Sequence, residues 1–238
     1  AIVKGEYQGP LDGIPIGIKD NIRTAGIRTT VGSKVLAEHV PDQDAFVVQR
    51  LKEAGAIVLG KENMHEWAAG GTSSNPFYGA VHNPWDLNHV PGGSSGGGAA
   101  NVAALVTFAS LGTDHAGSVR GPASYCGLVG IKPTHGLVSR AGVIALSPSL
   151  DTVGPLTRSV RDGAIVLQAI AAVDDEDSSS VPFDFPDLLH NLEDGLAGLR
   201  IGWPSNHFFE DTEGSVADGI DEVFRLMGRL GAECVDVE

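Results

Sequence analysis

The chain alternates between short apolar runs and segments rich in glycine and polar residues. Where apolar residues recur every three to four positions, as in residues 45–54, the pattern predicts an amphipathic helix, with Asp44 at its N-cap. An unbroken apolar run, as in residues 11–18, predicts a buried strand. The predicted strands are 11–18, 56–59, 127–132, 143–146 and 199–203, and the predicted helices are 45–54, 63–69, 98–110, 160–172 and 216–230. Helices that alternate with strands are typical of an α/β fold, which we therefore expect.

One acidic stretch interrupts this pattern. Residues 174–186, DDEDSSSVPFDFP, combine carboxylates with serine and proline, which favours a solvated linker. We therefore expect a core over residues 1–173, an acidic linker or loop over 174–187, and a further, incomplete part over 188–238.

Composition narrows the class of protein. Of the 238 residues, 42% are hydrophobic and 19% are charged, which is typical of a globular chain rather than a disordered one. The net charge of −14 argues against nonspecific binding of nucleic acid, because such binding needs a basic surface. The two cysteines, Cys126 and Cys234, provide no disulfide framework, and neither a signal peptide nor a membrane-spanning run is evident. We expect a cytoplasmic protein that binds neither membranes nor, directly, nucleic acid.

The glycine-rich stretch 91–120 carries the candidate chemistry. Its glycines let the backbone approach a ligand closely, and its amide groups can converge on a developing oxyanion. Ser94, Ser95 and Ser118 lie in or beside its turns, and a serine nucleophile needs an acid–base partner from elsewhere. Lys19 ends an apolar run, and burial there would lower its pKa, so that its neutral amine could act as a base.

Five segments give the chain a resemblance to a known family. It resembles the amidase signature family over about residues 5–173, because long and specific motifs occur in the family's order. The segments are GIPIGIKDNI (13–22), PGGSSGGG (91–98), GTDHAGSVRGPA (112–123), CGLVGIKPTHGLVSRAGV (126–143) and SPSLDTVGPLTRSV (147–160). The resemblance implies a mixed β-sheet surrounded by helices. Because the chain starts without Met and enters the Lys19 strand almost at once, we interpret it as a fragment whose residues 188–238 begin the second part of that fold.

The resemblance also implies a Ser-Ser-Lys triad. Ser118 matches the family's nucleophile, Ser94 its bridging serine on a cis peptide bond, and Lys19 its base. The oxyanion hole maps onto the backbone N–H groups of His115, Ala116, Gly117 and Ser118. The residues alone leave other interpretations open: both serines could be turn or capping residues, and Lys19 could reach solvent from a strand end.

Two positions depart from the family's pattern. Ala116 stands where the family has glycine, and its Cβ restricts the backbone and narrows the pocket. Gly98 stands where a further serine is common, so a helix-capping hydrogen bond is lost. These departures are the support for one alternative, a catalytically inactive scaffold.

The activity that the resemblance implies is amide hydrolysis through an acyl-serine intermediate, with no cofactor and no metal ion. The expected partner is a small-molecule amide, and a homo-oligomer is compatible with this interpretation. An alternative is the A subunit of a tRNA-dependent amidotransferase, which releases ammonia from glutamine and works with a second subunit. Residues 66–75, EWAAGGTSSN, are more similar to stand-alone amidases.

Other apparent motifs favour structural roles. Residues 55–61 are similar to a phosphate-binding loop, but Glu62 stands where Ser or Thr must bind Mg²⁺. His82 and His89 lie seven residues apart in a loop, which argues against a metal pair. We interpret Asp114 and Arg120 as a structural ion pair and Cys126 as a core residue.

Overall fold

The computed structural model describes residues 5–7, 9–204, 206 and 208–237. The chain divides into two compact units, Ala1–Leu189 and His190–Glu238, and each is described by itself. In the described part of the chain, no helix has the length and apolar character needed to cross a membrane.

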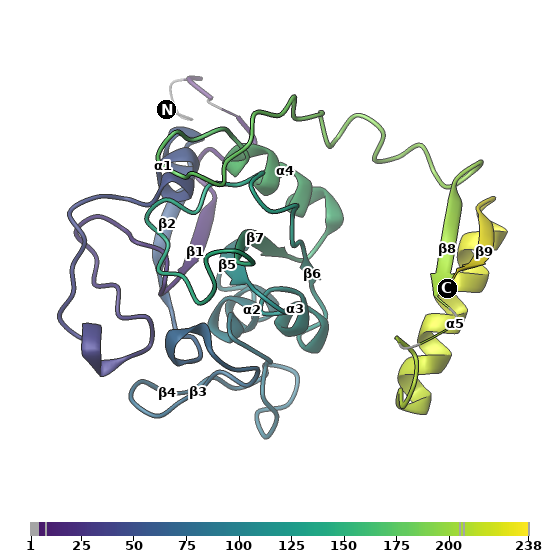
Figure 1. Ribbon diagram of the computed structural model, residues 1–238, viewed down its shortest axis with the longest axis horizontal. Coiled ribbons are helices and arrows are strands. Elements are labelled where there is room, and N and C mark those ends of the chain that lie inside the picture. The colour runs from purple at the N-terminus through teal and green to yellow at the C-terminus, as the bar shows by residue number, and fades with distance from the viewer. Residues whose placement is uncertain (1–4, 8, 205, 207, 238) are drawn as a thin grey trace. The chain divides into compact units, whose positions relative to one another are not determined.

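The first unit is built on a five-stranded mixed sheet (Figure 1). Its strand order is β2-β1-β5-β7-β6; β1 pairs in parallel with β2 and β5, whereas β7 runs antiparallel to β5 and β6. The strands are β1 (Pro15–Lys19), β2 (Ile57–Glu62), β5 (Ala109–Asp114), β6 (Val129–Gly130) and β7 (Thr152–Thr157). A separate short hairpin is formed by β3 (Ser74–Asn75) and β4 (Gly79–Ala80). The expected α/β class with a mixed sheet is confirmed.

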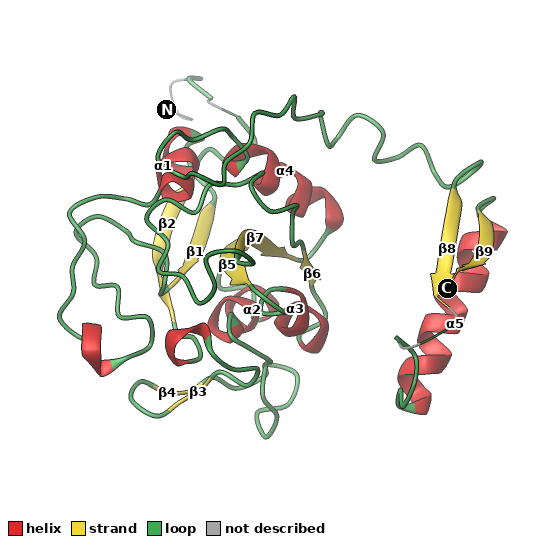
Figure 2. Ribbon diagram, viewed as in Figure 1, coloured by secondary structure: helices red, strands yellow, loops and turns green. Residues whose placement is uncertain are grey.

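Helices cover both faces of this sheet (Figure 2). On one face, α1 (Phe46–Glu53) and α4 (Val160–Ile170) pack against each other and the strands, and the main apolar core forms beneath them. On the other face lie α2 (Gly96–Ala103) and α3 (Arg120–Tyr125), over a smaller cluster that includes Cys126. Both α2 and α3 directly follow the serine-bearing turns, so the second face carries the candidate chemistry.

Several predicted elements differ from those observed. Helix 98–110 ends at Ala103, because Leu105 adopts a positive φ of 62° and residues 109–114 pair as β5. Helix 63–69 is reduced to a 3₁₀ turn, Glu66–Ala68, in which Trp67 has a φ of 53°. The predicted strand 143–146 forms one isolated bridge, between Val143 and Ile22.

The N-cap prediction for α1 is also wrong. Ala45 occupies that position without a side-chain cap. The Asp44 carboxylate instead accepts hydrogen bonds from the Ala25 N–H at 2.8 Å and from Lys52 Nζ at 2.6 Å. The carboxylate therefore joins the helix to the preceding loop.

The acidic segment 174–187 contains neither helix nor strand, and several of its carboxylates are held by hydrogen bonds from the first unit. Asp177 is buried, and it accepts hydrogen bonds from the Arg140 backbone N–H at 2.7 Å and from Ser179 Oγ at 2.7 Å. Ser139 Oγ donates to Asp174 at 2.5 Å. These contacts hold the segment on the first unit, and the two units divide after Leu189.

The second unit is a single β–α–β arrangement. Strands β8 (Arg200–Pro204) and β9 (Glu233–Val237) are parallel and are connected by α5 (Gly214–Arg229). Trp203 packs against Phe209 and Phe224, with ring centroids 4.7 and 4.1 Å apart. The strand and helix that the sequence predicts over 199–203 and 216–230 are present, whereas β9 was not predicted.

Candidate active site

Lys19 stands at the end of β1 with its side chain buried in the first unit. Its Nζ donates to Ser94 Oγ at 2.7 Å, to Thr113 Oγ1 at 2.8 Å and to the Thr113 carbonyl at 3.2 Å. Burial lowers the pKa of Lys19 to about 7, although the nearby carboxylates of Asp151 and Asp114 favour the charged form. A lysine at the end of a buried strand thus has the neutral form accessible near physiological pH.

The serine loop is shaped by close backbone packing. The Gly93–Ser94 peptide bond is cis, as the family resemblance implies. A Cβ on Gly93 would lie 2.8 Å from backbone atoms of residues 70–72, which explains why glycine is needed there. The loop leads directly into α2, and Ser94 and Ser95 are both buried. Ser94 therefore faces Lys19 inside the protein rather than solvent.

Asp114 organises the turn that carries Ser118. Its carboxylate accepts hydrogen bonds from the backbone N–H groups of Gly117 at 2.7 Å and Val119 at 3.1 Å, and from Arg120 Nε at 3.0 Å. Burial opposes ionisation of Asp114, but the bonds from Arg120 and these amides outweigh it and lower the pKa to about 2. The predicted ion pair between Asp114 and Arg120 is confirmed, and it holds the loop in shape.

Ser118 lines a pocket of about 440 Å³, together with residues of the serine loop. Its carbonyl accepts a hydrogen bond from the Ser95 N–H at 3.2 Å, so the two serine-bearing turns are in contact. The pocket is lined by Ala68, Ala69, Gly70, Gly71, Gly92, Gly93, His115, Ala116, Gly117, Ser118, Gly121, Tyr125 and Leu146. Within the expected triad, the direct side-chain hydrogen bond is the one between Lys19 and Ser94; Ser118 is connected to the serine loop through its backbone.

The four residues expected to form an oxyanion hole all line this pocket. The amide of Gly117, however, is directed at Asp114, which leaves the amides of His115, Ala116 and Ser118 as the candidate donors. Gly117 has a φ of 130°, a backbone conformation that residues with a side chain rarely adopt, so the turn requires glycine at this position.

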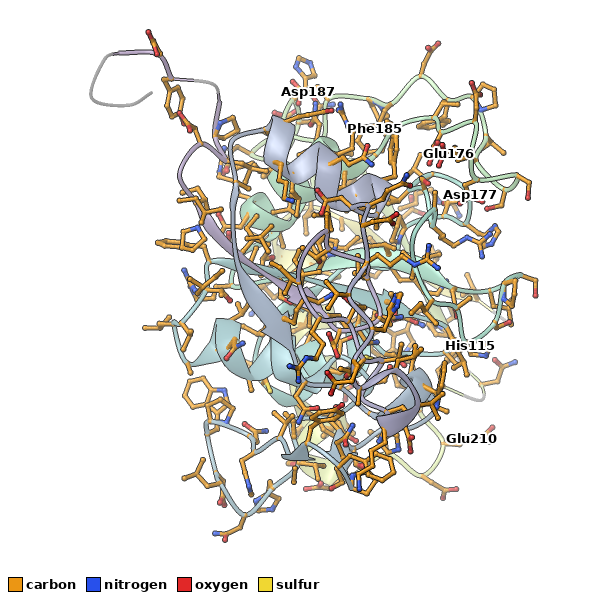
Figure 3. The ribbon with its side chains drawn as sticks, turned by 90° about the vertical axis from the view of Figure 1, so that its left-hand side faces the viewer. His115, Glu176, Asp177, Phe185, Asp187 and Glu210 are labelled. Atoms are coloured by element: carbon orange, nitrogen blue, oxygen red, sulfur yellow. The ribbon has the colours of Figure 1, made fainter. Side chains whose placement is uncertain are left out.

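Asp151 was missed by the sequence analysis. It precedes β7, is buried, and accepts hydrogen bonds from the backbone N–H groups of Leu146 at 2.7 Å and Ser147 at 3.0 Å. Its other oxygen lies 3.6 Å from Nδ1 of His115 (labelled in Figure 3). Asp151 lies in the matched segment 147–160, but only the pairing of β5 with β7 brings it beside the site.

Glu62 explains why position 98 holds glycine instead of the serine that is common in the family. Its buried carboxylate accepts hydrogen bonds from Ser110 Oγ and from Asn101 Nδ2, the latter at 3.2 Å. A Cβ on Gly98 would lie 2.8 Å from Glu62 Oε2 and would also collide with Ser110. Burial raises the pKa of Glu62 to about 7, even though both hydrogen bonds and Lys61 favour the ionised form. A side chain at position 98 is therefore excluded by the packing of this carboxyl group.

The remaining sequence candidates have structural roles. Most of the segment 55–61, which is similar to a phosphate-binding loop, belongs to strand β2 and does not form a phosphate-binding loop. Cys126 is fully buried, its Sγ donates to the Pro91 carbonyl at 3.6 Å, and burial raises its pKa to about 11. No cluster of three or more metal-ligating side chains occurs among the residues that the structure describes.

Curated proteins of similar sequence include amidotransferase subunits. The chain is 48% identical over 231 residues to the A subunit of glutamyl-tRNA(Gln) amidotransferase from Carboxydothermus hydrogenoformans, covering 97% of this chain and 48% of the relative. The corresponding protein of Heliobacterium modesticaldum is 49% identical over 235 residues, covering 99% and 48%. The chain thus spans about half the length of the curated relatives that it matches.

Two crystal structures are similar over nearly the whole chain. The A subunit of glutamyl-tRNA(Gln) amidotransferase from Thermotoga maritima has a TM-score of 0.92 at 45% identity, covering 95% of this chain and 51% of that one. The native peptide amidase from Stenotrophomonas maltophilia has a TM-score of 0.93 at 41% identity, covering 100% and 50%. The family model described as Amidase matches residues 1–238. The chain belongs to the amidase family.

Proposed function

We propose that the protein hydrolyses a carboxylic amide through an acyl intermediate on Ser118, with Lys19 and Ser94 as its proton relay. The observation that carries this proposal is the buried hydrogen bond of 2.7 Å between Lys19 and Ser94, beside the pocket that contains Ser118. A buried lysine with a lowered pKa can accept a proton near neutral pH, which an exposed lysine cannot do efficiently.

In the proposed reaction, Ser118 Oγ attacks the amide carbonyl carbon. Its proton passes to Ser94 Oγ while the proton of Ser94 passes to Lys19 Nζ. The carbonyl oxygen, now negative, is held by backbone N–H groups at 115, 116 and 118. Collapse of this intermediate breaks the C–N bond, and the relay returns the proton to the leaving amine. Water then attacks the acyl-serine by the same relay and releases the carboxylic acid.

A second candidate is the ammonia-releasing A subunit of an amidotransferase. It is favoured by the relatives of 48% and 49% identity, which carry that name. The structures of the A subunit and of peptide amidase are about equally similar to the chain, with TM-scores of 0.92 and 0.93, and do not separate the candidates. Residues 66–75, which are more similar to stand-alone amidases, favour the enzyme that acts alone. Both candidates use the same proposed triad and differ in substrate and partners: a small amide for the enzyme alone, or glutamine in a complex with a second subunit.

The two candidates are separated by assaying full-length protein purified alone. A stand-alone amidase turns over a simple aromatic amide faster than glutamine, and we expect this result. Glutamine cleavage that appears only in a complex with a second subunit, and that rises when tRNA and ATP are added, would assign the amidotransferase role. Ser118→Ala is the control in both assays, because either activity should be lost with it.

A further inference from the structure

Two glycines that line the pocket beside Ser118 are required neither by the backbone nor by packing in the described structure. Gly71 precedes the β3–β4 hairpin, and Gly121 lies in the first turn of α3. Neither has a positive φ, and a Cβ added to either would have no atom within 4 Å. Gly93, in the same pocket, differs because its Cβ would collide with backbone atoms. At positions 71 and 121, glycine therefore leaves open space in the pocket.

Gly121 is also not the residue that helix stability favours. Glycine is less favourable than alanine in a helix, because it loses more backbone freedom on folding. The Gly121 N–H donates to the Gly117 carbonyl at 2.6 Å, a hydrogen bond that alanine would keep. What glycine adds at this position is room, three residues beyond the proposed nucleophile Ser118.

One helical turn further along α3, Tyr125 supplies an aromatic ring to the same pocket. Residues four apart are neighbours on a helix surface, and both Gly121 and Tyr125 line the pocket. Tyr125 is 60% exposed, so no other described residue covers most of its ring. The backbone that carries it is held by Asn83 Nδ2, which donates to the Tyr125 carbonyl at 2.9 Å, and by Trp85 Nε1, which donates to the Cys126 carbonyl at 2.8 Å. The ring is thus an uncovered surface on a fixed backbone.

The part of the lining that the described residues supply contains no lysine, arginine or carboxylate. Its polar side chains are those of His115, Ser118 and Tyr125, and the rest are glycines and apolar side chains such as Leu146. A charged substituent would find no oppositely charged side chain in this lining, and the burial of an unpaired charge is unfavourable. An aromatic ring, by contrast, needs space and an apolar or aromatic surface, which this lining provides.

We propose that Gly121 and Tyr125 form the subsite for an aromatic group of the substrate, next to the amide carbonyl that Ser118 attacks. Gly121 provides the room for the ring, and Tyr125 provides the face against which it packs. The inference rests on the proposed function and narrows its substrate class to amides that carry an aromatic ring. The ring belongs either to the acyl part, as in benzamide, or to the leaving amine, as in acetanilide, and the experiment distinguishes the two.

The test measures kcat/KM of full-length protein and its variants for benzamide, acetanilide and acetamide. Because the three amides differ in intrinsic reactivity, the readout is the change in each kcat/KM on substitution. Gly121→Val should lower the value for at least one aromatic amide by about tenfold or more and that for acetamide by less than about threefold, because the added side chain occupies space that the ring needs. Gly121→Ala should act in the same direction, more weakly, without lowering the melting temperature, because its Cβ has open space.

Tyr125 is tested by a pair of substitutions. Tyr125→Phe retains the ring and should keep the kcat/KM for the aromatic amide, whereas Tyr125→Ala should lower it by about tenfold and spare acetamide. The matched control is Gly228→Val. Gly228 is an exposed glycine of α5 whose Cβ would also have no atom within 4 Å, and it does not line the pocket. This variant should leave all three values unchanged.

The outcomes separate this inference from the proposed function. Equal losses for acetamide and both aromatic amides in Gly121→Val and Gly121→Ala would overturn the inference, because the substitutions would then impair catalysis in general. Values for the aromatic amides that neither Gly121→Val nor Tyr125→Ala changes would overturn it as well, and so would cleavage of glutamine alone; Ser118 would remain the nucleophile in each case. If the unmodified protein shows no amide cleavage that Ser118→Ala abolishes, the proposed function itself fails.

Discussion

Replacing Glu62 with glutamine should remove a pH-dependent loss of stability. The folded protein raises the pKa of this carboxyl group from 4.5 to about 7, mainly because the group is buried. The folded state therefore holds the proton more tightly than the unfolded chain, and the free energy of unfolding falls as the pH rises through this range. The change from 4.5 to about 7 corresponds to about 3 kcal/mol, which is an upper value because a real interior relaxes around the charge.

The assay is urea unfolding of full-length protein at about pH 4.5 and about pH 8, with and without Glu62→Gln. The free energy of unfolding of the variant, relative to that of the unmodified protein, should increase by up to about 3 kcal/mol from the lower to the higher pH. Glu53→Gln is the matched control, because Glu53 is exposed and pairs with Arg50 on the surface of α1, and it should show no such change. If Glu62→Gln changed the free energy of unfolding by the same amount at both pH values, the reasoning would be refuted.

Two further predictions concern the base and the serine loop. The kcat/KM of the unmodified protein should rise with pH through about 7, where burial places the pKa of Lys19. Lys19→Met should abolish this pH-dependent rise, whereas Lys61→Met, at the half-buried lysine of β2, should retain it; a rise that survives in Lys19→Met would contradict the assignment. Gly93→Ala should lower both the melting temperature and the activity, because the added Cβ would lie 2.8 Å from the backbone of residues 70–72. The control is Gly60→Ala, whose Cβ would have no atom within 4 Å; an equal fall in melting temperature for both variants would argue against close packing as the cause.

The parts of the site that lie in continuous motifs could be predicted from the sequence. Lys19 follows an apolar run, and Ser94 lies in a glycine-rich loop, so local pattern and family resemblance identify both. The hydrogen bond of 2.7 Å between them forms in a sheet where β1 pairs with β5. The sequence predicted a mixed sheet but not this strand pairing. Asp151 has no local signal of this kind, because its place beside Lys19 depends on the register of β5 and β7.

Element boundaries were less predictable where competing interactions decide them. The alanine- and valine-rich segment 98–110 suits a helix, but its last residues pair into β5, and tertiary pairing overrides local propensity there. The acidic segment 174–187 has the composition of a linker, yet Ser139 and Arg140 supply donors that hold its carboxylates on the first unit. The composition of a segment does not reveal donors that lie elsewhere in the chain.

The central claim, that Ser118 is the nucleophile of a Lys19–Ser94 relay, is tested most directly by covalent labelling. Full-length protein is treated with a fluorophosphonate, digested, and analysed by mass spectrometry to locate the modified serine. We expect a single label on Ser118, no label in Ser118→Ala, and labelling that is slowed by about 100-fold or more in Lys19→Met, because the relay that activates the hydroxyl is then lost. A label on Ser94, on Ser95 or on a serine outside the pocket would contradict the account.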